Sequence, residues 1–325
     1  VACQHGGDMA VAKSLVDASK EAGADIVKFQ IHVPEAEQVP GAVHFWAGDM
    51  EKVLEQVNFP LAEQHLELKK YCEKVGVQYL CTPFCIEAAE RLGEVGVDAY
   101  KVGSGELSNL PMLRFLAQTK KPIIISTGMS RMEEIRDAVT IMREEGAQFM
   151  LMHTLSEYPP RGFKNMNLRL IEKIREEFNV LVGFSDHSVN EVEALVSAAV
   201  TLRAPLIEKH FTLDDITGPD DSVSLGPAQF KRMVEMVKNI EQALNGNRYV
   251  SDGEKNVRSW AHHSVVSSRE IKKGEILTLE NLLPKRPGTG IEAKYLDKLY
   301  AGKLLGKKAK RNLPKNTILT WGDCV

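Results

Sequence analysis

The chain has 325 residues, enough for one large and one small domain. Charged residues make up 26% of it, yet the formal net charge is only −3, so we expect neither nucleic acid nor an acidic membrane surface as a partner. No apolar run is long enough to span a bilayer, and the first residues do not resemble a signal peptide. Five scattered cysteines without metal-finger spacing favour free thiols in a reducing cytoplasm, so we expect a cytoplasmic protein.

Short apolar runs recur at a steady spacing over residues 1–245, and each is followed by an amphipathic helical pattern. The predicted strands are Val1–Gln4, Asp25–Gln30, Val77–Thr82, Ala99–Val102, Pro122–Thr127, Phe149–Thr154, Val180–Ser185 and Leu206–His210. Several predicted helices close on a glycine, namely Gly23, Gly76, Gly96 and Gly146. Continuous apolar strands that alternate with helices form parallel sheets, and eight such units in about 250 residues predict a TIM (β/α)8 barrel. Val1 stands inside the first predicted strand, so we expect residues to precede it.

A doubly wound open sheet is the alternative α/β fold, but no glycine-rich dinucleotide turn follows the first strand. The connection after the second strand is unusually long and contains His32, His44, Phe45 and Trp46 within residues 31–60. A long loop on the catalytic face of a barrel is often a lid or an interface element. Packing of these aromatic side chains on the barrel is an equally good interpretation.

The composition changes after Leu244. Residues 246–263 are polar and are predicted to be a linker, and residues 264–325 are predicted to form a small, mainly β domain. Two similar pieces, residues 271–278 and 313–320, each resemble a turn that feeds a short strand. A domain of about 60 residues is marginally stable alone, so we expect it to dock on something larger.

Polar side chains stand at the carboxyl ends of seven predicted strands, where a TIM barrel places its active site. Lysines and hydroxyls at these ends would form a cradle for a phosphate and a carboxylate. They are Lys28, Thr82, Lys101, Ser104, Ser126 and Ser185. A lone lysine is more often a solvated charge and a lone hydroxyl is often a helix cap. A solvated charge is the weaker interpretation for Lys28 and Lys101, because both lie within apolar strands, where no solvated face is available.

His187 and His210 end neighbouring predicted strands, the seventh and the eighth, so their imidazoles can meet over the barrel mouth. Two imidazoles with carboxylates and waters suit a divalent transition ion such as Mn²⁺. A single histidine is more often a hydrogen-bonded core residue, but two at adjacent strand ends favour a metal site. Asp186 and Glu208 are near in sequence, and strand alternation leaves their direction open. His153 fits a core residue or a general acid/base.

A series of short motifs runs through nearly the whole chain. They are Gln4–Asp8, Lys28–Gln30, Thr82–Phe84, Lys101–Glu106, Ser126–Met129, Ser156–Pro159, Gly183–Ser188, Glu208–Asp214, Gly218–Asp220 and Lys285–Ile291. In this order they resemble the sialic acid (N-acetylneuraminate) synthases and their legionaminic and pseudaminic acid relatives. The last motif resembles the antifreeze-like (SAF, β-clip) domain of that family.

The resemblance implies an enzyme, a metal-dependent transferase that condenses phosphoenolpyruvate with N-acetylmannosamine and water. The products would be N-acetylneuraminate and phosphate, released with cleavage of the C–O bond. A legionaminic or pseudaminic acid synthase, acting on a 2,4-diacetamido-6-deoxy sugar, is the alternative. Another phosphoenolpyruvate-dependent keto-deoxy sugar acid synthase, or a non-catalytic carbohydrate-binding protein, fits less well, because a scaffold has no need of polar groups at seven strand ends.

The resemblance also assigns roles to individual residues. Catalytic positions match Lys28, Lys101, Glu106, His187 and His210, of which the two histidines would hold Mn²⁺, Mg²⁺ or Co²⁺. Substrate-binding positions match Lys28, Thr82, Lys101, Ser104, Ser126, Ser156, Tyr158, Ser185, Asp220 and Arg286. The family's domain-swapped homodimer implies that Arg286 binds the N-acyl group of the sugar in the partner's barrel. A surface charge beside a turn is the alternative for Arg286.

Three departures from the family pattern concern the acceptor sugar. Gln4 stands where the family usually has Asn, and Ser156 stands where Asn is common. Asp221 and Ser222 follow Gly218–Asp220, where sialic acid synthases often carry a basic residue or His. These differences leave the identity of the acceptor sugar undecided. They do not affect the expectation that phosphoenolpyruvate is the other substrate.

Overall fold

The computed structural model describes residues 1–41, 43–44, 48–244, 246–247 and 249–325. They form two compact units, Val1–Asn245 and Gly246–Val325. Each unit has its own buried apolar cluster, so each is described by itself. No helix among these residues is long and apolar enough to cross a membrane.

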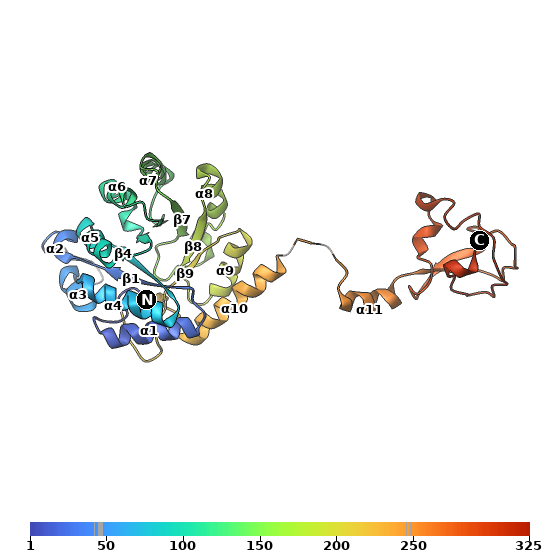
Figure 1. The fold of residues 1–325 in the computed structure, drawn as a ribbon, viewed down its shortest axis with the longest axis horizontal. Helices are drawn as coiled ribbons and strands as arrows, with labels where there is room; N and C mark the ends of the chain where they lie inside the picture. Colours follow the sequence, from blue (N-terminus) through green and yellow to red (C-terminus); the bar gives the residue numbers. More distant parts are fainter. Residues whose placement is uncertain (42, 45–47, 245, 248) are drawn as a thin grey trace. The chain divides into compact units, whose positions relative to one another are not determined.

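The first unit is built on a curled parallel sheet with helices on its outer side (Figure 1). In spatial order its strands are β1 (Ile26–Ile31), β4 (Gln78–Pro83), β5 (Tyr100–Val102), β6 (Ile123–Ser126), β7 (Phe149–Thr154), β8 (Val182–Asp186) and β9 (Ile207–Lys209). Every neighbouring pair is parallel. The order follows the sequence, as a TIM barrel requires, and the predicted fold class is confirmed.

The first of the eight predicted strands is not formed as predicted. Val1–Gln4 contributes a single parallel bridge, between Ala2 and Phe29 of β1. The chain turns away at once, because Ala2 has a φ of +45° and the amide of Gln4 donates to the Val1 carbonyl at 2.9 Å. Among the described residues the sheet therefore has seven strands, with β1 and β9 at its two edges.

Amphipathic helices cover the sheet and pack their apolar faces on it. The longer helices are α1 (Met9–Glu21), α4 (Ala62–Val75), α5 (Ile86–Val95), α6 (Leu110–Gln118), α7 (Met132–Glu144), α8 (Leu170–Phe178), α9 (Val192–Thr201) and α10 (Pro227–Ala243). Single 3-10 turns are formed by η1 (Gly105–Ser108), η2 (Phe163–Asn165) and η3 (Asp221–Val223). The four glycines predicted to end helices all have a positive φ, and Gly76 and Gly96 are the left-handed caps of α4 and α5.

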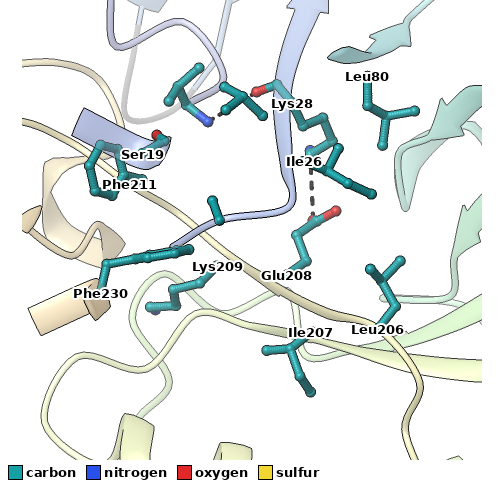
Figure 2. Close-up of a pocket in the computed structure, with 13 residues that line it drawn as sticks. Ser19, Ile26, Lys28, Leu80, Leu206, Ile207, Glu208, Lys209, Phe211 and Phe230 are labelled. Atoms are coloured by element: carbon teal, nitrogen blue, oxygen red, sulfur yellow. Dashed lines mark hydrogen bonds and ion pairs between the residues drawn. The ribbon is translucent and has the colours of Figure 1, made fainter. Parts of the chain in front are cut away.

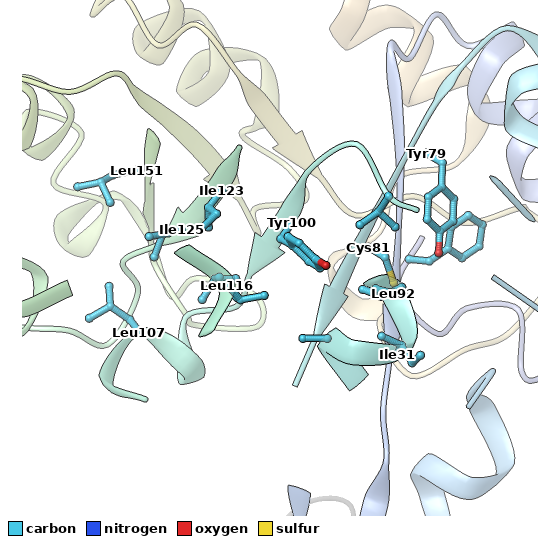
Figure 3. Close-up of a cluster of buried hydrophobic side chains, with 14 of the residues drawn as sticks. Ile31, Tyr79, Cys81, Leu92, Tyr100, Leu107, Leu116, Ile123, Ile125 and Leu151 are labelled. Atoms are coloured by element: carbon cyan, nitrogen blue, oxygen red, sulfur yellow. The ribbon is translucent and has the colours of Figure 1, made fainter. Parts of the chain in front are cut away.

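The core lies between the sheet and this helical layer (Figure 3). Tyr100 of β5 and Ile123 and Ile125 of β6 are almost completely buried, as are Leu92 of α5 and Leu116 of α6. Burial on both faces explains why the strands are continuous apolar runs in the sequence. It also explains why polar residues inside these runs need partners or a ligand.

The long connection after β1 contains α2 (Pro34–Glu37), β2 (Val43–His44), β3 (Gly48–Asp49) and α3 (Met50–Val57). His32 is buried, stacks on Phe84 with ring centroids 4.1 Å apart, and pairs with Glu37 at 2.8 Å. For His32 the structure therefore supports the second interpretation, in which the side chain packs on the barrel. The predicted roles of the His44 side chain, Phe45 and Trp46 lie outside the described residues.

The second unit begins with a helix that the sequence did not predict. α11 (Asp252–Ala261) lies in the segment predicted to be a linker. Its start has a physical cause, because the Ser251 hydroxyl accepts from the Glu254 amide at 3.2 Å while the Glu254 carboxylate accepts from the Ser251 amide at 3.0 Å. This capping box is readable in the sequence as Ser-Asp-Gly-Glu.

The rest of the second unit is compact and mainly β. β10 (Ser264–Ser267) pairs antiparallel with β11 (Leu282–Lys285), and the two similar pieces of the sequence meet in a bridge between Ile271 and Leu313. Short turns η4 (Ala293–Leu296), η5 (Lys298–Tyr300) and η6 (Trp321–Asp323) complete it. Val265, Leu277 and Leu319 belong to its own core, as predicted for a small β domain.

Candidate active site

Lysine and hydroxyl side chains from four strands converge on the carboxylate of Glu208. Lys101 Nζ donates to Ser126 Oγ at 2.6 Å and lies 3.9 Å from Glu208 Oε2. Lys28 Nζ lies 3.6 Å from Glu208 Oε1, and Ser185 Oγ donates to the same oxygen at 2.9 Å. The structure therefore brings together four of the six residues predicted for the cradle, from β1, β5, β6 and β8, and Thr82 and Ser104 are not among the contacts of this cluster.

The charges in this cluster depend on one another. Burial lowers the pKa of Lys101 to about 8, and the carboxylate of Glu208 opposes that effect. Burial alone would raise the pKa of Glu208, but the ammonium groups of Lys101 and Lys28 outweigh it and hold that pKa well below its usual range. Two cations against one carboxylate leave net positive charge, which suits an anionic ligand.

Glu208 is the main site residue that sequence reasoning missed. Lys209, its neighbour, points to the opposite face and forms a fully buried ion pair with Asp186 at 3.3 Å. Successive side chains of a strand point to opposite faces, so Glu208 and His210 point to one face and Lys209 points to the other. The ion pair with Asp186 fixes the direction of Lys209 and leaves Glu208 facing the site, which the sequence alone does not show.

A second group of hydroxyls surrounds the backbone of Gly128. Ser104 Oγ accepts from the Gly128 amide at 3.1 Å. A β-carbon on Gly128 would lie 2.7 Å from Ser104 Oγ and would collide with Ser156 Oγ. Ser156 Oγ is buried without a hydrogen-bond partner among the described residues, and so is Thr82 Oγ1 near the end of β4. Leaving a buried hydroxyl unpaired is costly, so each of the two is a candidate contact for a polar ligand.

Glu106 stands beside this group as a candidate acid or base. Its Oε2 is buried without a partner in the described part of the chain, and a β-carbon on Gly103 would collide with it. Burial raises its pKa to about 7, the charge of Glu37 adds to the rise, and Lys101 opposes it. A carboxyl group with a pKa near neutrality can both donate and accept a proton at physiological pH.

The two predicted metal ligands meet as expected. The rings of His187 and His210 have centroids 5.2 Å apart, and the ring of Tyr158 lies 4.2 Å from that of His187. His187 Nδ1 lies 2.8 Å from the Leu155 carbonyl, which only accepts, so Nδ1 carries the proton and Nε2 keeps its lone pair. Burial, together with the nearby His210, lowers the pKa of His187 to about 4 and keeps it neutral at pH 7.

The donor set fits a divalent ion that completes its shell with oxygen ligands. Asp220 Oδ2 lies 3.4 Å from His210 Nδ1 and the Leu155 carbonyl lies 2.8 Å from His187 Nδ1, so an acceptor oxygen lies near Nδ1 of each imidazole. Such acceptors orient metal-binding histidines and raise their basicity. No group of three or more His, Cys, Asp or Glu in the described ranges forms a complete site, so water and substrate oxygens would have to supply the remaining ligands.

The remaining predicted residue, Arg286, lies in the second unit. Its guanidinium carbon is 5.8 Å from the ring centroid of Trp260 in α11. The loop that follows is held on the same helix, since the Gly288 amide donates to the Ser259 carbonyl at 2.8 Å. A β-carbon on Gly288 would lie 2.6 Å from that of His262. α11 therefore braces the loop that presents Arg286.

A cavity lies between β1 and β9 (Figure 2). Lys28 and Glu208 face each other in it, while the other side chains around them, such as Leu80, Leu206 and Phe230, are mainly apolar. None of the hydroxyls or histidines described above lines this cavity. Lys28 and Glu208 therefore belong to both the cavity and the polar cluster, and the candidate active site is the cluster, which also holds the hydroxyls and the histidines.

Comparisons with known proteins show the family of the chain. Residues 15–249 match the NeuB family and residues 262–325 match the SAF domain. The chain belongs to the NeuB family.

The relatives extend this assignment over the whole chain. An uncharacterized protein of Methanocaldococcus jannaschii is 37% identical over 99% of this chain and 92% of its own. The N,N′-diacetyllegionaminic acid synthase of Campylobacter jejuni is 34% identical over 97% of this chain and 96% of its own. The solved N-acetylneuraminic acid synthetase of Leptospira borgpetersenii is similar, with a TM-score of 0.68 and 27% identity over 79% of this chain and 87% of that one. The predictions of a transferase-type enzyme and of an SAF domain in this NeuB chain are confirmed.

Proposed function

We propose that the protein condenses phosphoenolpyruvate with an N-acetylated amino sugar and water, giving a nonulosonic acid and phosphate. The observation that carries this proposal is the cluster of Lys28, Lys101 and Glu208 on the same strand ends as the two histidines. It offers a cationic cradle for a phosphorylated acid next to a pair of imidazoles for an ion. The names of the legionaminic and sialic acid synthases above support the same reaction.

The chain's own groups would divide the work. Lys28 and Lys101, with Ser126 and Ser185, would bind the phosphate and carboxylate of phosphoenolpyruvate and displace Glu208 from the lysines. Carbon 3 of phosphoenolpyruvate would attack the aldehyde of the open-chain sugar, leaving positive charge at carbon 2. Water would add there, and phosphate would leave with its C–O bond cleaved. Protonated Glu106 is a candidate donor to the new alkoxide.

We further propose that His187 and His210 hold a divalent ion, most simply Mn²⁺. When bound, such an ion supplies Lewis-acid activation of the sugar aldehyde. Tyr158 covers one face of the His187 ring and would keep bulk water from that side. Asp220 holds His210 in orientation through its contact at Nδ1.

For the acceptor we favour a 2,4-diacetamido-6-deoxy sugar over N-acetylmannosamine. The legionaminic acid synthase of Campylobacter jejuni matches 97% of this chain at 34% identity, and the human N-acetylneuraminate-9-phosphate synthase matches 86% of it at 32%. Asp221 and Ser156 also depart from the sialic acid pattern next to the site. A pocket that hydrogen-bonds a second acetamido group would discriminate strongly against a sugar without it, because its polar groups would be left unpaired.

The deciding experiment measures phosphate release from phosphoenolpyruvate with Mn²⁺ and each sugar in turn. Release with a diacetamido sugar and little with N-acetylmannosamine is expected. Release only with N-acetylmannosamine keeps the reaction and reverses the choice of sugar. No release with any amino sugar, from protein that binds both Mn²⁺ and phosphoenolpyruvate, would refute the proposed function.

A further inference from the structure

The side chain of Gln4 connects the N-terminal segment to the loop after β9. Gln4 is only 2% exposed. Its Nε2 donates to Asp221 Oδ1 at 2.7 Å and to Thr212 Oγ1 at 3.1 Å, and its Oε1 accepts from the Asp220 amide at 3.0 Å. One amide therefore makes three hydrogen bonds to residues more than 200 positions away in the sequence.

The loop is closed tightly around this amide. Asp221 Oδ1 also accepts from the Gly218 amide at 3.0 Å, and Ser224 Oγ donates to the Asp220 carbonyl at 2.8 Å. A β-carbon on Gly218 would collide with Gln4 Oε1. There is no spare room between the loop and the amide, so the position of the Asp220 backbone follows the position of the Gln4 side chain.

Asp220 is the residue in this loop that reaches the site. Its carboxylate lies 3.4 Å from His210 Nδ1, while its backbone amide is held by Gln4. A displacement of the loop would therefore change the acceptor that sets the direction of the His210 ring. Two departures from the family pattern, Gln4 and Asp221, are thus partners in a single hydrogen bond.

We propose that Gln4 is a positioning residue: through Asp220 it fixes the His210 imidazole in the orientation that binds the divalent ion. This inference deepens the proposed function and rests on it for the identity of the ion-binding pair. The side-chain hydrogen bonds of Gln4 go to Thr212, Asp220 and Asp221, and none of these residues is in the lysine cluster. Its loss should therefore act on ion binding and turnover and leave phosphoenolpyruvate binding almost unchanged.

The test compares Gln4→Leu with a matched control, Thr212→Val. Gln4→Leu removes all three hydrogen bonds at similar volume, whereas Thr212→Val removes one of them and leaves the contact to Asp220. Mn²⁺ affinity is measured by isothermal titration on protein freed of metal, without substrates. We expect Gln4→Leu to weaken Mn²⁺ binding about 10- to 100-fold, as loss of an orienting partner does in metal sites. Thr212→Val should keep the wild-type affinity within about threefold.

Kinetics on the full chain distinguish a role of Gln4 in positioning His210 from a role in protein stability alone. Gln4→Leu should lower kcat and leave the KM for phosphoenolpyruvate within about twofold, and Gln4→Asn, which keeps the amide on a shorter stem, should fall between it and wild type. Wild-type Mn²⁺ affinity in Gln4→Leu overturns the proposal, and so does equal loss in Thr212→Val. If Gln4→Leu does not fold, Gln4→Asn decides by the same affinity criterion. The titration needs no turnover, so it stands even if no sugar is accepted.

Discussion

Lys101 is the most informative single residue of the site, because its side chain is only 2% exposed and yet its ammonium group faces a serine and a carboxylate. We expect Lys101→Met to lower kcat/KM for phosphoenolpyruvate at least about 100-fold, since it removes a buried charge that binds the anion. Mn²⁺ affinity should change little. Lys13→Met, at a surface ion pair with Glu67, is the control and should leave kcat/KM unchanged. Full activity of Lys101→Met would contradict the assignment of the cradle.

Glu106 predicts a specific dependence of stability on pH. Its pKa is raised from 4.5 to about 7 by burial, so the folded protein holds a proton that the unfolded chain has lost between these values. Stability then falls as pH rises from about 4.5 to about 7, and the loss persists above that range. Glu106→Gln lacks this penalty and should be more stable than wild type by up to roughly 3 kcal/mol at pH 8, with no gain below about pH 4. Urea unfolding at both pH values measures it, and an equal difference at both would refute it.

At the scale of residues, the sequence predicted the types of group more reliably than their partners. The lysines, hydroxyls and histidines were visible because they interrupt apolar strands. Glu208 was missed because its direction depends on which neighbour faces the core, and that required the ion pair of Lys209 with Asp186. The role of Gln4 could not be predicted, since its partners lie more than 200 residues away and are joined only by the fold.

At the scale of elements, the turn after β6 brings the backbone of Gly128 close to two serine hydroxyls of the site. Gly128→Ala would push a methyl group into Ser156 Oγ and against Ser104 Oγ. We expect a loss of about 1–3 kcal/mol in the free energy of unfolding, and a higher KM for the acceptor sugar. Adding Ser156→Ala removes the colliding oxygen and should recover part of the stability. Non-recovery in the double variant, measured by thermal unfolding, would show that the strain lies elsewhere in the turn.

The elements themselves were predicted well where periodicity was strong. β1 and β4–β9 follow the predicted apolar runs within a few residues, because parallel strands buried on both faces leave a continuous apolar signal. The first predicted strand was reduced to one bridge by a turn at Ala2, which a four-residue pattern cannot reveal. α11 was missed because its residues are mainly polar and none is buried, so the segment has the composition of a linker and the capping box is what marks its start.

At the scale of the whole molecule, the second unit has a buried core of its own and presents Arg286 from a braced loop. A separate core is what a small domain needs if it is to act as a rigid support for one side chain. From the resemblance to the sialic acid synthases, we expect this arginine to bind the N-acyl group of the sugar. Its action on a partner's barrel is still a prediction, and it can be separated from action on its own barrel by mixing two inactive variants.

The two variants are Lys101→Met, which disables the barrel, and Arg286→Ala, which disables the second unit. If each second unit completes the partner's site in a homodimer, unfolding and refolding an equal mixture creates heterodimers with one intact site. Random pairing should then restore about a quarter of wild-type activity. If Arg286 acts on the barrel of its own chain, every active site contains one of the two inactivating substitutions. The mixture then stays as inactive as either variant alone. Sedimentation of the wild-type protein provides the control: the first outcome requires a dimer, and a fully active monomer would refute the swapped arrangement.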